Sequence, residues 1–309
     1  MASSNQRQIR EHVYHAEASA VHGELKLPYA TKIERQAHAK VNPKGGYESQ
    51  EGTPFHVEGI VSYFTAHTQV AGHLEDQQKK PGRGYKTLSS SLAENLNLLN
   101  VVTADRVIAQ ISTEHPLYED EGHVPIVTFL GTQFVNLRIG GYAVEVELDL
   151  DLLDPEKHSC KMSFPENPGF VDRLKQRLED FEKRFEQSED VEDQTDTRVQ
   201  PDPKVVEDFR KRYGSSVDQN GTQYTELSLV KSIKTRAPWK PIGNLFDIPH
   251  FGQLRLGVVR IYHSDPELNI PKTTLIEVSM IEATMGCIAS GTVVCVSGKT
   301  NGTTSPGTG

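Results

Sequence analysis

The sequence predicts an all-β protein built from sandwich-like antiparallel sheets with a two-helix insertion. Three observations support this: many segments alternate apolar with polar residues, turn-rich stretches separate them, and one region has helical spacing instead. The clearest alternating segment is residues 142–153, YAVEVELDLDLL. Because successive side chains of a strand point to opposite faces, this segment presents one apolar face and one face with four carboxylates.

Size, composition and charge limit the number of domains, the partners and the location that can be expected for this protein. The chain has 309 residues, of which 36% are hydrophobic, enough for one large or two modest domains. Its net charge of −9 argues against nucleic acid and anionic lipid as partners. No apolar run reaches the roughly 18 residues that a membrane-spanning helix needs, so no membrane insertion is expected. The N-terminus lacks a secretory signal, which predicts a cytoplasmic protein, or an extracellular or cell-surface one if this is a mature form.

The first half of the chain is predicted to be a flexible N-terminus, residues 1–16, followed by the first part of the β domain, residues 17–160. Residues 31–41 alternate, with Arg35 as the one charge on the apolar row. Residues 42–53 are rich in turn formers and predict a loop. The other predicted strands are residues 55–74 (two strands or one bent strand), 85–99, 101–113, 126–139 and 142–153.

Residues 161–216 are predicted to be a helical insertion with an acidic linker, packed on the sheet or on a partner chain. Asn167 is expected to cap a first helix that runs to Gln187. Asp202 starts a second, shorter helix that Gly214 ends. The predicted inward faces carry Val171, Leu174, Leu178, Phe181 and Phe185 on the first helix, and Val206, Phe209 and Tyr213 on the second.

Residues 217–297 are predicted to form the second part of the β domain, and residues 298–309 a flexible Gly/Thr/Ser tail. Its strands are residues 222–233, 253–263, 273–285 and 287–297. If residues 290–292 form a hairpin loop, Cys287 faces Cys295 at a Cα separation of about 4.5–5.5 Å, which suits a disulfide. The alternative is a pair of buried thiols in a reducing compartment.

Histidines and a carboxylate raise the question of a metal site. His67, His73 and Glu75 share one face of a predicted strand, and such residues can bind a divalent ion. Six residues span about 20 Å, so both histidines reach one ion only if the strand turns at Gly72. A second pair on one face is His56 and Glu58. Solvated polar residues of a strand are the alternative.

Two further groups have a chemical and a structural interpretation each. The acidic row of residues 142–153 places alternate carboxylates about 6.6–7 Å apart, near the separation in inverting glycosidases, but it also suits weak calcium binding or a solvated face. This row is Glu145, Glu147, Asp149 and Asp151. The aromatic loop of residues 236–251 could line a ligand groove or fold onto the sheet edge; it includes Trp239, Phe246, His250 and Phe251. No G-x-S-x-G nucleophile motif or phosphate-binding loop is present.

Four segments share turn and core positions with a known family: residues 95–99 with 103–107, residues 132–141, residues 249–256 and residues 274–278. They resemble bacterial extracellular β proteins of the choice-of-anchor type. The likeness covers residues 85–150 and 245–296. It implies a secreted surface or matrix domain with no established catalytic residues, so none carry over. The chain departs from that pattern in lacking a signal peptide and in its helices at residues 164–214.

The leading functional prediction is a structural or interaction protein, a self-associating or partner-binding β domain. It would assemble with itself or another protein through an exposed strand edge, or through the helix face of residues 171–185. The first alternative is a metal-dependent or carbohydrate-processing enzyme that uses His56, His67 and His73. The second is a carbohydrate-binding module around Trp239. No catalytic, cofactor-binding or metal residue is assigned, and no cofactor is expected.

Overall fold

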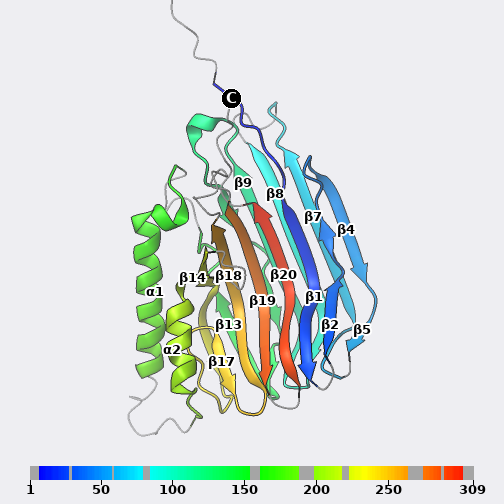
Figure 1. Cartoon of the computed structure of the whole chain (residues 1–309), viewed down its shortest axis with the longest axis vertical. Coiled ribbons are helices and arrows are strands. Elements are labelled where there is room, and N and C mark those ends of the chain that lie inside the picture. The colour runs from blue at the N-terminus through cyan, green and yellow to red at the C-terminus, as the bar shows by residue number, and fades with distance from the viewer. Residues whose placement is uncertain are drawn as a thin grey trace, which may run out of the picture.

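The computed structural model describes residues 7–27, 30–57, 59–78, 84–153, 161–187, 198–217, 223–263, 274–286 and 289–301. In this part of the chain, two antiparallel sheets pack face to face without closing into a barrel, and two helices lie along one side of them (Figure 1). The prediction of a β sandwich with a two-helix insertion is therefore confirmed.

The first sheet has nine strands, and its middle is formed by strands from the two ends of the chain. β1 pairs with β20, which pairs with β19. The order is β14 (Gly214–Val217), β15 (Gln223–Ser228), β18 (Gly252–His263), β19 (Thr274–Gly286), β20 (Ser290–Asn301), β1 (Ala16–Leu27) and β2 (Thr31–Gln36), with β17 (Leu245–Ile248) on β18 and β3 (Ala39–Lys40) on β1.

The second sheet has eleven strands, and the long hairpin of β8 and β9 forms its middle. The order is β16 (Val230–Thr235), β13 (Tyr142–Leu148), β12 (Arg138–Ile139), β9 (Val102–His115), β8 (Tyr85–Leu98), β6 (Val61–Tyr63) and β5 (Phe55–Val57). Four strands branch from this path: β7 (Thr65–Leu74) pairs with β8, β4 (Gly46–Gly52) with β7, and β10 (Ile126–Thr128) and β11 (Gln133–Val135) with β9.

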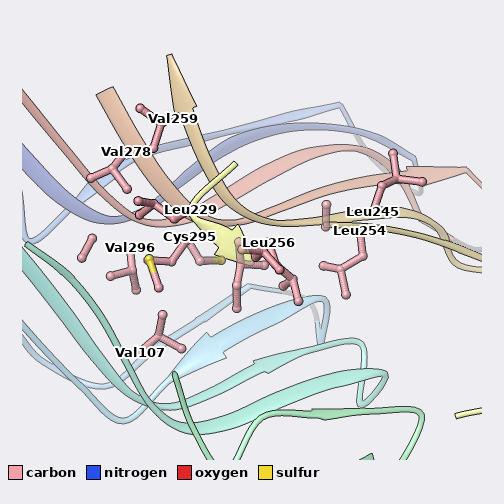
Figure 2. Packing of buried hydrophobic residues seen from close by; sticks show 14 of the residues in the cluster. Val107, Leu229, Leu245, Leu254, Leu256, Val259, Val278, Cys295 and Val296 are labelled. Carbon is pink, nitrogen blue, oxygen red and sulfur yellow. The ribbon is translucent and has the colours of Figure 1, made fainter. Parts of the chain in front are cut away.

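The core between the sheets is apolar in one part and rich in hydroxyl groups in another. In the apolar part, shown in Figure 2, side chains of β18–β20 meet Val107 of β9. In the polar part, the Ser89 hydroxyl donates to the carbonyl of Glu17 at 2.6 Å, and the Ser91 hydroxyl to that of Ser19 at 2.9 Å. These bonds join β8 of one sheet to β1 of the other, so small buried hydroxyls replace part of the apolar core.

Residues with left-handed backbone interrupt long strands in both sheets. Gly257 and Val296 have φ of 57° and 56° in the first sheet, and Asn95 has φ of 52° in the second. Such a residue turns the chain so that the alternation of faces changes phase. Ala93 and Leu96 are accordingly both buried although they are three residues apart.

The helices α1 (Pro168–Gln187) and α2 (Pro203–Arg212) begin where the sequence predicts. Two short 3₁₀ turns lie earlier in the chain, at Glu119–Glu121 and at Phe164–Glu166. The Asn167 side chain accepts from the amide of Phe170 at 3.2 Å, and that of Asp202 from the amide of Lys204 at 2.8 Å. Their apolar residues are buried against the sandwich of the same chain, among them Phe170, Leu174, Phe181, Val206 and Phe209. Of the two packings expected for this helix face, on the sheet or on a partner chain, the structure shows the first, in which the face packs on its own domain with Leu178 and Phe185 partly buried.

Several predicted boundaries differ from the observed ones. The strand predicted for residues 142–153 ends at Leu148, because Asp149 enters a turn in which its amide donates to the carbonyl of Leu229 at 2.7 Å. Residues 222–233 are two strands in different sheets, because the chain crosses between the sheets at Leu229. Residues 126–139 are three short strands, all paired with β9. The predicted loop of residues 42–53 contains β4.

The ends of the chain also differ from expectation where they are described. Arg10 and Tyr14 are buried, so this part of residues 1–16 is held against the domain. β20 continues to Asn301, beyond the predicted start of the tail at residue 298. Residues 302–309 and the linker at residues 188–197 lie outside the described residues.

The proposed register of the two cysteines is wrong. Cys295 lies opposite Ile281 on β19 and opposite Val21 on β1, because Gly286 pairs with Ser290, which sets a register other than the predicted one. Cys295 is a free, fully buried thiol, and burial raises its pKa. Cys287 lies outside the described residues.

Candidate functional site

The arrangement of β7 that a metal site would require is not present in the described residues. β7 pairs in unbroken register with β8, and Gly72 itself pairs with Thr87, so the strand does not turn between His67 and His73. His56 lies on β5, where its ring accepts from the amide of Gly59 at 3.3 Å, and Glu58 lies outside the described residues. Within the described ranges, no three His, Cys, Asp or Glu side chains are close enough to hold one ion.

The acidic row of residues 145–151 is divided between a strand and a turn. Glu147 binds the Lys231 ammonium at 2.8 Å and accepts from the Ser232 hydroxyl at 2.8 Å. Asp149 binds Arg177 of α1, so it attaches the helix to the sheet. Glu145 and Asp151 are exposed. The row therefore supplies contacts between elements. Asp149 and Asp151 line one pocket beside α1 together with Arg173, Arg177 and Arg184, and Asp149 is paired there with Arg177.

The aromatic residues of the loop around Trp239 point into different environments. The half-buried Trp239 ring covers Gly140, where a Cβ would lie 2.4 Å from it, and meets Tyr142 edge to face. Phe246 and Phe251 are core residues, whereas His250 is exposed. These side chains therefore do not line a common groove.

The outer face of the first sheet carries a buried charge cluster that the sequence does not reveal. Arg260 binds Glu226 at 3.0 Å and Glu282 at 2.5 Å, and Arg255 bridges the same two carboxylates at 2.7 Å and 2.5 Å. Signs alternate from strand to strand, since Glu226 lies on β15, the arginines on β18 and Glu282 on β19. The alternation continues with Lys299 on β20, Glu17 on β1 and Arg35 on β2.

This arrangement keeps Glu282 and Glu17 ionised. Burial would raise the pKa of Glu282, but Arg255 and Arg260 lower it to about 2. Burial acts in the same direction on Glu17, whose pKa Lys40 and Arg35 lower to about 2. A carboxylate with such a pKa is a poor general acid or base near neutral pH. The cluster therefore fits the role of fixing strand order and register.

One side of the sandwich is closed by α1. The Arg177 guanidinium donates to the carbonyl of Val230 at 3.0 Å, and that of Arg184 donates to the carbonyl of Lys231. Both carbonyls belong to β16, the strand that ends the second sheet. Helix side chains thus occupy hydrogen-bonding groups that an edge strand would otherwise expose.

The opposite side has no such cover among the described residues. There β2 pairs with β1 but with no further strand outward, and β4 is joined to the second sheet only through β7. Figure 1 shows both strands on the side away from the helices. We call these two edges the open side.

The two strands of the open side differ in charge. β4 exposes Tyr47, Glu48 and Glu51 and carries no basic residue. β2 carries Lys32 and Arg35, and also Glu34, which pairs with Lys32 at 2.9 Å. The sequence did not reveal β4 because neither face of this strand is apolar, so the usual alternation is missing. The candidate functional site is therefore the open side, where β4 is acidic and β2 carries one more basic than acidic residue.

Residues 12–262 match a protein family described as Domain of unknown function (DUF8256). The chain belongs to this family. No curated protein and no solved structure matches it. The DUF8256 match contains both helices and the open side, whereas β19 and β20 lie beyond it. None of the described helices is long and apolar enough to cross a membrane.

Proposed function

We propose that this DUF8256 protein is a structural or interaction protein, a self-associating β domain that joins a second copy through its open side. The proposal rests on one observation: helix side chains cover the edge strand on one side of the sandwich, whereas no described element covers the edge strands on the other side. α1 occupies edge carbonyls of β16, whereas β2 and β4 end their sheets with no described neighbour outward. An exposed edge offers unpaired backbone groups to another strand.

Charge favours one arrangement of the two copies. Placing β4 against β4 of a second copy would bring Glu48 and Glu51 together with their equivalents, and like charges on neighbouring strands oppose pairing. Placing β4 against β2 brings these carboxylates toward a strand with two basic residues and one acidic residue, Lys32, Arg35 and Glu34, of which Lys32 and Glu34 pair with each other. A two-fold axis parallel to the strands makes both β2–β4 contacts at once, which gives an interface that closes on itself.

Sedimentation velocity over a range of concentrations tests this proposal. We expect the wild-type protein to form a species of about twice the chain mass of 34.4 kDa. The dissociation constant of the E48K/E51K dimer should be roughly tenfold or more higher than that of the wild type, because the variant replaces attraction by repulsion at both contacts.

The matched control is E179K/E186K on α1, which makes the same change in net charge at exposed positions away from the open side. It should associate like the wild type. A wild-type protein that stays monomeric, or a control that weakens association as much as E48K/E51K, would contradict the proposal. Both compartments predicted from the sequence are compatible with it, and the likeness to choice-of-anchor-type proteins supports the cell surface.

A further inference from the structure

The N-terminal segment before β1 lies across the ends of β8 and β9. We call residues 7–15 the N-terminal strap. The amide of Arg10 donates to the carbonyl of Leu117 at 3.0 Å, and the Tyr85 hydroxyl donates to the carbonyl of Arg10 at 2.6 Å. The Arg10 side chain is buried and donates to the carbonyl of Gly122. The strap is therefore bound through its backbone and through a buried cation.

His12 lies at the centre of this attachment. Its ring stacks on Tyr85 with centroids 4.6 Å apart, and it meets Tyr14 at 4.7 Å and His115 at 4.8 Å. Both of its ring nitrogens are buried, and neither has a hydrogen-bond partner in the described part of the chain. A neutral imidazole tolerates such surroundings far better than a charged one.

The strap also holds the turn that leads into β4. The amide of Tyr14 donates to the carbonyl of Pro43 at 3.0 Å. The Tyr14 ring lies over Gly45 and Gly72, where added Cβ atoms would come within 3.0 Å and 2.5 Å of it. Since β4 begins at Gly46, the position of Tyr14 is coupled to the position of this edge strand.

We propose that the N-terminal strap is an acid-released latch, in which protonation of His12 detaches the strap and loosens the turn that positions β4. The consequence for assembly rests on the proposed function of the open side. The detachment of the strap does not, because all the contacts that hold it lie within one chain.

The groups around His12 determine whether acid or base favours detachment of the strap. Burial lowers the pKa of His12 to about 4, and the Arg10 guanidinium acts in the same direction. The other groups facing the ring are Tyr14, Tyr85 and His115. The carboxylates at this end act on other groups. Burial lowers the pKa of Arg10 and Glu119 acts against that change, while Glu75 and Glu114 pair with Lys86.

A detached strap exposes His12, whose pKa then returns to near 6.5. The open state therefore binds protons more readily, so acidification below pH 6.5 favours it increasingly down to about pH 4. At pH 5 the equilibrium between open and closed strap should shift by roughly 30-fold relative to neutral pH. His15 also has a lowered pKa, through burial, so a variant at His12 is needed to isolate the effect.

Amide hydrogen exchange of Arg10 and Tyr14, corrected for the intrinsic pH dependence of exchange, reports the opening. We expect roughly 30-fold more opening at pH 5 than at pH 7.5 in the wild type, and no such change in H12F, which keeps the stacked ring. A wild type whose protection does not depend on pH, or an H12F variant with the same pH response, would overturn the proposal.

Two further measurements keep the test independent of assembly and of the folding of H12F. The same exchange experiment on E48K/E51K should show the same opening, because the latch lies within one chain; an unchanged strap in that variant would overturn the proposal. An NMR titration of His12 in the wild type should give a midpoint near pH 4, whereas a midpoint near 6.5 would contradict the buried, neutral ring.

Discussion

Gly257 is the residue on which the buried charge cluster depends. In a regular strand Arg255 and Arg260, five positions apart, would point to opposite faces. The φ of 57° at Gly257 changes the phase between them, so both arginines reach Glu282. A glycine within a strand is only a weak signal of such an irregularity, which is why the sequence predicted the strand but not the cluster.

Replacing one carboxylate of this cluster should be costly. E282Q leaves Arg255 and Arg260 buried with one anion fewer, and we expect the free energy of unfolding to fall by about 3 kcal/mol or more. Urea denaturation at neutral pH measures this fall in the free energy of unfolding.

E147Q is the control, because Glu147 is in an exposed ion pair with Lys231 that should contribute little to stability. A small effect of E282Q, equal to that of the control, would show that the cluster is not stabilised by its pairing.

At the scale of elements, the sheets approach each other most closely where β20 faces β8. A Cβ added at Gly298 would lie 2.7 Å from the Ser89 hydroxyl, so G298A should destabilise the fold by about 1–3 kcal/mol. S89A removes the obstructing oxygen and leaves the next contact at 3.5 Å. The double variant should therefore be more stable than the sum of the two single changes predicts, a coupling of about 1 kcal/mol.

Thermal or urea unfolding of the four proteins in this cycle gives the coupling. G286A is the matched control, because a Cβ at Gly286 meets nothing within 4 Å, and it should change stability by less than about 0.5 kcal/mol. Simple additivity of G298A and S89A would contradict the close packing of β20 on β8.

The elements that sequence analysis predicted well share a physical property. β8, β9 and β18 are long and have buried apolar residues, and the two helices have capping residues and an apolar stripe. β4 was missed because both of its faces are exposed. The β19–β20 register was missed because a turn position inside an apolar run has no distinct pattern.

On the scale of the whole molecule, local sequence patterns also could not locate the candidate site. The sequence predicted association through an exposed strand edge in general, but which strands form that edge depends on sheet order and on where α1 packs. These are long-range properties that local patterns do not encode. The metal site suggested by His67 and His73 fails for the complementary reason, since spacing along a chain does not bring side chains together without a turn.

The central claim is that the open side joins two copies by reciprocal contact of β2 with β4. Its most direct test is native mass spectrometry of two charge-reversed variants, E48K/E51K and K32E, measured separately and then mixed in equal amounts. Each variant alone places like charges at both contacts and should be largely monomeric. The mixture places opposite charges at both contacts and should restore a heterodimer. A mixture that stays as monomeric as its components would contradict the reciprocal pairing of β2 with β4.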